Sequence, residues 1–244
     1  MISLYKLILI VVAVTISVTS NAQNKTEYSA TTTELTFNSS GKRMSGFVYT
    51  AAGKGPHPTV LLLHGYPGNE KNLDVAQALR SNGWNVVFFH YRGAWGSEGE
   101  FSLLNAEKDV QVVLQYIINE KNAAKLRIDR DLISIVGHSM GGHMAIAGIL
   151  DNASVNCAIA YDGANLGVSD IGIIEDPETN VPWKEYSDTL FMLNGWSGDK
   201  LAKESRDHGK ELNLVRRVST INSRPVLLIA ADTDIIPMKS HIKP

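Results

Sequence analysis

The sequence contains a single cysteine, Cys157, in 244 residues, so the chain cannot form an internal disulfide. Its fold must therefore be held together by a hydrophobic core rather than by cross-links. Cys157 lies in the apolar run at residues 155–160, where we expect it to be a small buried side chain within a strand.

The sequence also lacks an excess of charge of one sign. It has 23 Lys and Arg residues against 25 Asp and Glu residues, a net charge of −2 and a pI of about 6.4. Without a basic field we expect no nucleic-acid partner and no attraction to an anionic membrane surface. No internal repeat or low-complexity tract is visible. The 44% hydrophobic content is ordinary for a globular chain of one large or two small domains.

A hydrophobic run long enough to span a bilayer comfortably is missing, since such a helix needs about 20 residues. The apolar run at residues 7–18 is shorter than that. Lys6 precedes it, and Ser20 and Ala22 place small residues at the −3 and −1 positions of a cleavage site. This pattern predicts a secretory signal peptide over residues 1–22 and a secreted or periplasmic mature protein. A retained N-terminal anchor is the alternative.

Short apolar runs alternate with helical patterns through the middle of the chain. Continuous apolar runs at residues 60–63, 86–89 and 132–136 predict strands covered on both faces. Residues 72–81 and 106–119 carry apolar side chains at the period of an amphipathic helix. Further strands are expected at residues 33–37, 44–50, 158–161 and 226–230, and a further helix at residues 140–150. This alternation predicts an α/β fold with a mostly parallel sheet and flanking helices.

The alternation is interrupted over residues 164–222. This stretch contains many charges and scattered aromatic residues, among them Trp183 and Trp196, but no continuous strand-like run. We interpret it as a mainly helical cap inserted over the carboxyl edge of the sheet. The core is then divided in two, with residues 23–163 before the cap and residues 223–244 after it.

The pattern G-x-S-x-G occurs at residues 137–141, directly after a predicted strand and directly before a predicted helix. In that context the chain turns sharply, and Gly137 and Gly141 remove side chains that would clash with the strand and the helix. The serine hydroxyl then projects at the carboxyl end of the sheet, near the positive end of the helix dipole. Ser139 is therefore the predicted nucleophile. A glycine-rich turn that only packs a helix against the sheet is the alternative.

A serine nucleophile needs hydrogen-bond donors for the oxyanion that forms when it attacks a carbonyl. The backbone N–H of Met140 is the first donor that we expect. The loop after the strand at residues 60–63 should supply the second, and our candidate is the N–H of Tyr66, with Gly65 allowing close approach. His64 belongs to the same loop, and we expect it to shape the loop by hydrogen bonding rather than to act as the base.

Three segments together resemble the α/β-hydrolase superfamily: HGYPG at residues 64–68, YRGAWGSEG at residues 91–99 and GHSMGG at residues 137–142. The sequence is most similar to the prolyl-oligopeptidase-like and dienelactone-hydrolase-like branches, over about residues 44–237. The resemblance implies an α/β-hydrolase fold with a helical cap, and hydrolysis through an acyl-serine intermediate without a metal or organic cofactor. Dienelactone hydrolases proper are less similar, because they place cysteine where this chain has Ser139.

The resemblance also implies an acidic residue after the strand at residues 226–230. The family has a stretch of the form strand–G–x–x–D before a proline, and this sequence matches it with Ala231 in the glycine's place, which selects Asp234. The spacing to the proline is one residue shorter than in the commonest version, which leaves Asp232 open. Asp162, at the end of the preceding strand, is the third candidate.

The family's order of serine, acid and histidine places the base after the acid. The single histidine after Asp234 is His241, seven positions later, whereas a crossover to another parallel strand needs at least about a dozen residues. We therefore expect the sequence to be incomplete at its C-terminus and the catalytic histidine to lie beyond residue 244. His241 is the alternative base, and His143 and His208 are weaker candidates.

The activity expected from this resemblance is hydrolysis of a small carboxylic ester. A chain of this length has no room for the N-terminal propeller of true prolyl oligopeptidases, which favours esters over peptides. An exopeptidase or acyl-peptide hydrolase is the alternative within enzymes. From a different class, a non-catalytic binding protein or decayed pseudoenzyme on a hydrolase scaffold would explain the missing histidine. The expected partner is a small ester or peptide substrate, with no membrane contact beyond a retained anchor.

Overall fold

The computed structural model describes residues 28–167, 181–221 and 224–230. Within them the strands are β1 (Thr31–Ser39), β2 (Lys42–Thr50), β3 (His57–Leu63), β4 (Asn85–Phe89), β5 (Ile128–His138), β6 (Val155–Tyr161) and β7 (Val226–Ile229). The predicted signal peptide at residues 1–22 lies outside the described residues. So do three of the candidate site residues, Asp232, Asp234 and His241.

The helices of the described part come between and after these strands. They are α2 (Leu73–Ser81), α3 (Leu103–Ile118), α4 (Glu120–Leu126), α5 (Met140–Asp151), α6 (Val181–Asp188) and α7 (Gly198–Leu212), followed by the short 3-10 helices η2 (Leu214–Arg216) and η3 (Val218–Thr220). Helix α4 was not expected from the sequence. It begins after Asn119, whose extended backbone ends α3 and whose side chain accepts hydrogen bonds from the N–H groups of Lys121 and Asn122 in the first turn of α4.

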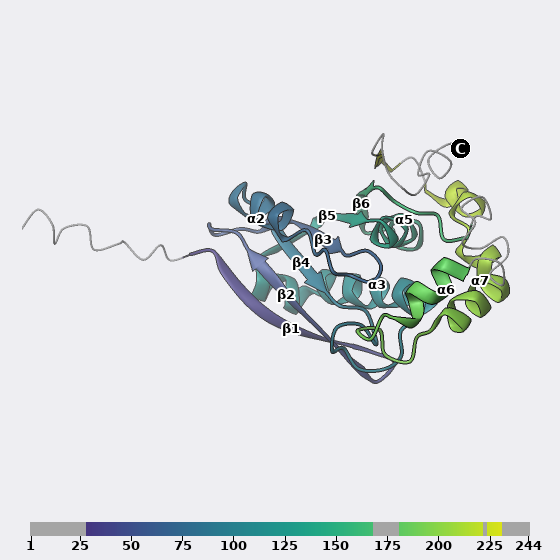
Figure 1. Ribbon diagram of the computed structural model, residues 1–244. Coiled ribbons are helices and arrows are strands. Elements are labelled where there is room, and N and C mark those ends of the chain that lie inside the picture. Colours follow the sequence, from purple (N-terminus) through teal and green to yellow (C-terminus); the bar gives the residue numbers. More distant parts are fainter. Residues whose placement is uncertain (1–27, 168–180, 222–223, 231–244) are drawn as a thin grey trace, which may run out of the picture.

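The described strands form one seven-stranded sheet in the order β1-β2-β4-β3-β5-β6-β7 (Figure 1). Strands β1 and β2 form an antiparallel hairpin, and β2 is antiparallel to β4. From β4 to β7 all neighbours are parallel. The predicted α/β architecture with a mostly parallel sheet is confirmed. Because parallel strands end at one edge, the loops after β3, β5 and β6 meet there.

Both faces of the central strands are buried, which explains their continuous apolar runs. On β3, Leu61 and Leu63 pack in the same core cluster as residues of α3 and α5, whereas Val60 and Leu62 pack with Ala76 of α2 on the opposite face. Cys157 differs from the expectation. It is only partly buried, and its Sγ lies 3.1 Å from Oγ of Ser134 on the neighbouring strand.

The described part of the predicted cap contains helices α6 and α7, which lie side by side beyond one end of the sheet (Figure 1). An antiparallel bridge joins Leu193, between these helices, to Ala94 in the loop after β4. On α7, the carboxylate of Glu204 accepts hydrogen bonds from the N–H groups of Leu103 and Leu104, at distances of 2.8 and 3.2 Å. A negative charge at the N-terminus of α3 is favourable there. The bridge and the Glu204 carboxylate thus join the segment to the core, although its status as a separate domain stays a prediction.

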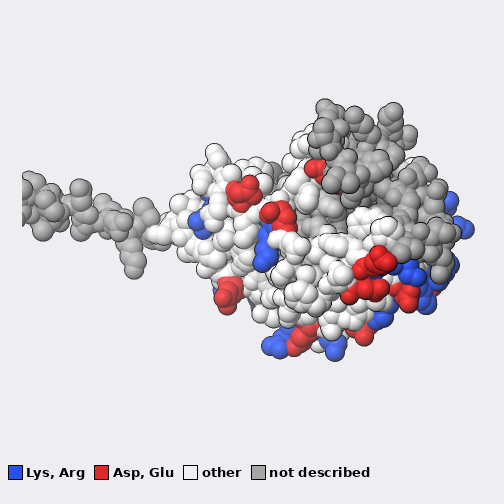
Figure 2. All heavy atoms as spheres, in the orientation of Figure 1, with Lys and Arg blue, Asp and Glu red and all other residues white. Residues whose placement is uncertain are grey.

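The surface shows no strong field of one sign on the face drawn in Figure 2, where acidic and basic side chains are intermixed around α6 and α7. Helix α7 accounts for this mixture, since Lys203 pairs with Asp207 one turn later along its exposed side. Within the described residues, no helix combines the length and the apolar character needed to cross a bilayer.

Candidate active site

Ser139 lies at the sharp turn between β5 and α5. Its backbone has φ 54° and ψ −118°, a conformation that residues other than glycine rarely adopt. Two backbone hydrogen bonds of 3.2 Å hold it there: the N–H of Ser139 donates to the carbonyl of Tyr161, and the N–H of Ala164 donates to the carbonyl of Ser139. The strand β6 and the loop after it therefore fix the strained residue from one side.

The glycines on either side of Ser139 are required by close backbone contacts. A Cβ atom on Gly137 would lie 1.9 Å from the carbonyl oxygen of Gly141, so that the strand could not meet the helix. A Cβ atom on Gly141 would lie 2.4 Å from the carbonyl oxygen of Leu63, the last residue of β3. The turn is thus packed directly against the strand that leads into the HGYPG loop.

The HGYPG loop lies beside the serine. A Cβ atom on Gly65 would be 3.0 Å from Cβ of Ser139, so a larger residue would force one of the two to shift by a few tenths of an ångström. Within the described residues, the backbone N–H groups of Tyr66 and Met140 donate to no protein acceptor. That of Met140 belongs to the first turn of α5, where N–H groups lack partners inside the helix. The loop that carries Tyr66 and the helix end that carries Met140 therefore meet at Ser139.

A pair of histidines and a tryptophan hold the HGYPG loop in place. His64 is buried, and its Nδ1–H donates to the carbonyl of Gly65 at 2.9 Å, as expected from the sequence. Its Nε2 lies 3.3 Å from Nδ1 of His90, which follows β4. The indole N–H of Trp95 donates to the carbonyl of Pro67 at 2.8 Å. The sequence indicated no role for His90, and Trp95 was noted only as part of the YRGAWGSEG segment.

Both histidines of this pair are held in the neutral form. Burial lowers the pKa of His64 to about 4, although the hydrogen bond to Gly65 opposes the change. Burial also lowers the pKa of His90 to about 3, and the neighbouring His64 and Lys71 lower it further. The loop therefore keeps its neutral imidazole–imidazole hydrogen bond over the physiological pH range.

These lowered pKa values should destabilise the protein in acid. Below the ordinary value of 6.5 the unfolded chain binds a proton on each histidine, whereas the folded chain does not until pH approaches 4. The free energy of unfolding should therefore decrease as the pH is lowered through this window, by up to about 1.4 kcal/mol per pH unit for each histidine. The free energy of unfolding of His90→Gln, measured with urea at several pH values in this window, should depend less steeply on pH than that of the wild type. His208→Gln on α7 is the control. If the free energy of unfolding depends equally on pH in both variants, the buried histidine pair is not the source of the acid sensitivity.

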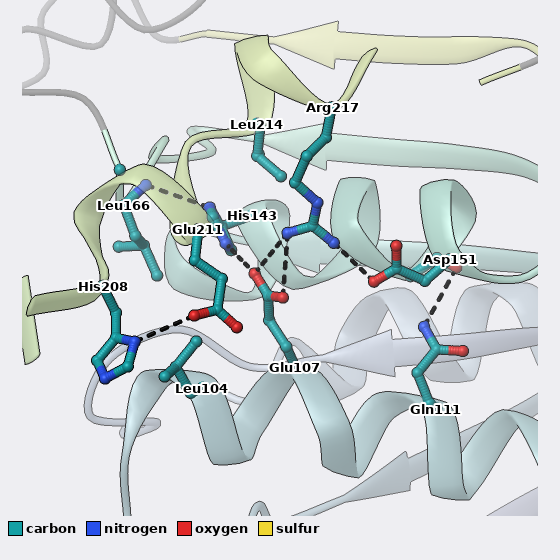
Figure 3. A network of polar contacts seen from close by, with 12 residues as sticks. Leu104, Glu107, Gln111, His143, Asp151, Leu166, His208, Glu211, Leu214 and Arg217 are labelled. Carbon is teal, nitrogen blue, oxygen red and sulfur yellow. Dashed lines mark hydrogen bonds and ion pairs between the residues drawn. The ribbon is translucent and has the colours of Figure 1, made fainter. Parts of the chain in front are cut away.

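The two histidines that were weaker candidates for the base do not point to the nucleophile. His143 is buried on α5, where its Nδ1 accepts from the N–H of Leu166 at 3.2 Å and its Nε2–H donates to Oε1 of Glu107 at 2.7 Å (Figure 3). Both ring nitrogens are thus occupied. His208 lies on the exposed side of α7, 3.0 Å from the carboxylate of Glu211.

The carboxylate of Glu107 connects His143 to Arg217 (Figure 3). Both oxygens of its carboxylate accept from Nη1 of Arg217 at 3.1 Å, and Nη2 of Arg217 donates to Asp151 at 2.6 Å. Burial alone would raise the pKa of Glu107, but the hydrogen bond from His143 and the charge of Arg217 outweigh it and lower that pKa. The network anchors α5, the helix that begins behind the nucleophile, to α3 and to the segment between η2 and η3.

Of the three acid candidates, Asp162 lies within the described residues. It follows β6 with a positive φ of 45°, and its N–H donates to the carbonyl of Ile229 at 2.8 Å. It is therefore at the same edge of the sheet as Ser139. Asp232 and Asp234 follow β7, the parallel neighbour of β6, but their positions are outside the described residues. No group of three or more metal-ligating side chains gathers in the part of the chain that is described.

Residues 47–176, which are 130 of the 244, match the family model of BD-FAE. The chain belongs to the BD-FAE family. The matched range includes the HGYPG loop, the YRGAWGSEG segment and the turn at Ser139.

This BD-FAE chain is similar to the lysophosphatidylserine lipase ABHD12 of Danio rerio, with 33% identity over 100 residues. The match covers 40% of the chain and 24% of that protein, so the chain spans about a quarter of this relative.

Two solved structures show the same fold. The α/β hydrolase GrgF of Penicillium sp. sh18 has a TM-score of 0.64 at 14% identity, covering 86% of this chain and 83% of that one. The Pyrococcus horikoshii acylaminoacyl peptidase has a TM-score of 0.57 at 22% identity, covering 84% of this chain and 32% of the peptidase. The family match and these structures together confirm the predicted membership of the α/β-hydrolase superfamily.

Proposed function

We propose that this protein is a serine hydrolase that cleaves carboxylic esters through an acyl-serine intermediate, with Ser139 as the nucleophile. The observation that carries the proposal is the arrangement at the turn between β5 and α5. There a strained serine lies beside a glycine-containing loop, next to two backbone N–H groups that donate to no acceptor within the described residues. These are the parts that acyl transfer requires.

In the first step, Oγ of Ser139 adds to the acyl carbonyl while its proton passes to the base. The carbonyl oxygen becomes an oxyanion, which accepts hydrogen bonds from the N–H groups of Met140 and Tyr66. The intermediate then expels the alcohol, which takes the proton from the base. Water attacks the acyl-serine by the same sequence and releases the carboxylic acid, so that the enzyme is regenerated.

The base and its acidic partner complete this proposal. We assign the acid to Asp234, with Asp232 and Asp162 as alternatives, and propose a histidine as the base; His241 is the histidine that follows Asp234 in this sequence. The acid orients the imidazole and stabilises its protonated form. Exchanging each aspartate for asparagine in turn identifies the acid, because the correct exchange should lower turnover by about 10⁴-fold.

Esters are proposed ahead of peptides because of the relative that is named as a lipase. Identity to that protein is 33%, whereas identity to the acylaminoacyl peptidase is 22%. Hydrolysis of acyl-peptides is the alternative within the same mechanism, since both reactions pass through an acyl-serine.

The experiment uses the purified protein and a fluorophosphonate probe, followed by peptide mapping. We expect the label on Ser139. Parallel assays with a p-nitrophenyl ester and a p-nitroanilide of the same acyl group then separate the two activities, because only the bond to the leaving group differs. Faster cleavage of the anilide would favour the peptidase alternative. If the probe labels no serine, a binding protein on a hydrolase scaffold becomes the better proposal.

A further inference from the structure

We propose that Tyr66 is a positioning residue through which the segment at residues 181–198 holds the HGYPG loop in its oxyanion-binding position. The inference rests on the proposed function, in which the backbone N–H of Tyr66 binds the oxyanion. It assigns a separate task to the side chain of the same residue.

The hydroxyl group of Tyr66 is hydrogen-bonded on both sides by this segment. It donates to Oγ of Ser187 on α6 at 2.8 Å and accepts from the indole N–H of Trp196, ahead of α7, at 2.7 Å. Ser187 is 1% exposed, so the contact is shielded from water. Since the hydroxyl has one proton to donate, and Ser187 takes it, the group is engaged with the protein rather than offered to a substrate.

The ring of Tyr66 is held by aromatic neighbours from two parts of the chain. Its centroid lies 6.1 Å from that of Phe101, before α3, and 6.2 Å from that of Tyr186 on α6. Phe101 in turn packs edge-on against Trp196 at 5.2 Å. The side chain is therefore packed, as well as hydrogen-bonded, against residues that belong to the segment or contact it.

This contact holds a different residue of the loop from the one that the histidine pair holds. His64, at the start of the loop, is held by His90, whereas Tyr66 is held by Ser187 and Trp196. An oxyanion donor must lie about 2.7–3.1 Å from the oxygen that it stabilises. A displacement of about 1 Å can cost on the order of 10²-fold in rate. Release of the hydroxyl should therefore weaken oxyanion binding without removing any atom that touches the substrate.

The test compares Tyr66→Phe, Trp196→Phe and the double variant in the full-length protein. Each single variant should lower both kcat and the rate of fluorophosphonate labelling of Ser139 by about 10-fold or more, with little change in KM. The double variant should lose no more than Tyr66→Phe alone, because both changes remove the same hydrogen bond. The control is Tyr116→Phe on α3, whose ring packs on Phe37 of β1 and which should behave as the wild type.

A second measurement follows backbone hydrogen exchange in the peptide that contains residues 64–68. Faster exchange is expected in Tyr66→Phe and in Trp196→Phe, and this readout does not depend on activity. Ser187→Ala, which removes one hydrogen bond and no ring, should give the same effects at smaller size and serves if Trp196→Phe folds poorly.

The outcomes separate the two proposals. If the wild type is not labelled on Ser139, the proposed function fails, while hydrogen exchange still decides the positioning role. If labelling is normal but Trp196→Phe and Ser187→Ala match the wild type in rate and exchange, the positioning role is overturned. A loss in Tyr66→Phe alone, with normal exchange, would overturn it as well, because the hydroxyl would then act on the substrate directly.

Discussion

Replacement of Ser139 by alanine should lower ester turnover by about 10⁴-fold or more. The exchange removes Oγ alone, and alanine meets the same backbone strain as serine, so the turn and its hydrogen bonds should persist. The measurement is kcat with a p-nitrophenyl ester, together with the urea midpoint to show that the fold is intact. Ser81→Ala is the matched control, because this exposed serine on α2 donates only to the carbonyl of Gln77.

Some activity should survive in Ser139→Ala, since the oxyanion donors and substrate binding alone can give about 10³-fold over water. Full loss of fluorophosphonate labelling should accompany the fall in turnover. Turnover within tenfold of the wild type, with the fold intact, would show that another residue is the nucleophile.

Replacement of Asp109 by alanine should lower the free energy of unfolding by about 3–5 kcal/mol. Asp109 is fully buried on α3, and its carboxylate accepts from Nε of Arg92 at 2.6 Å and from the backbone N–H of Arg92 at 2.8 Å. Arg92 itself is 7% exposed. The variant would leave its guanidinium buried, and among the described residues its one remaining hydrogen-bond partner would be the carbonyl of Asn105 at 3.3 Å. A buried charge that loses its counter-ion accounts for the size of the effect.

Urea unfolding monitored by far-UV circular dichroism measures this loss. The control is Asp207→Ala, which removes the exposed pair with Lys203 on α7 and should leave the unfolding midpoint unchanged. Catalysis should also suffer in Asp109→Ala, because Arg92 begins the loop that carries Trp95. A variant with wild-type stability would mean that water enters and solvates the guanidinium.

Local patterns were sufficient to predict most of the sheet. The apolar runs on β3 and β4 reflect burial on two faces, and their short length favours strands over helices. The start of α3 at Leu103 was predicted three residues too late. The first turn of this helix is stabilised by the side chain of Ser102, which caps it, and by the carboxylate of Glu204, about a hundred residues away in the sequence. A contact over such a distance leaves no periodicity in the sequence.

In the candidate site, too, residues specified by a local motif were predicted, whereas contacts between distant segments were not. Ser139, Met140 and Tyr66 were predicted because a motif and its neighbouring strand specify them locally. The contacts that support the loop join residues 26, 28, 121 and 130 positions apart, and nothing in the sequence around His90 or Trp196 indicates them. Asp234, the signal peptide and the position of the histidine stay predictions.

The strained backbone at Ser139 sets an evolutionary constraint on this position. Its φ of 54° belongs to a region that glycine occupies at little cost, so a random change to glycine would relieve the strain. The same change would delete the hydroxyl. Under the proposed function, selection for a more stable fold and selection for catalysis therefore act in opposite directions at this residue. The folding free energy that offsets the strain at the serine has to come from the packing of the rest of the molecule.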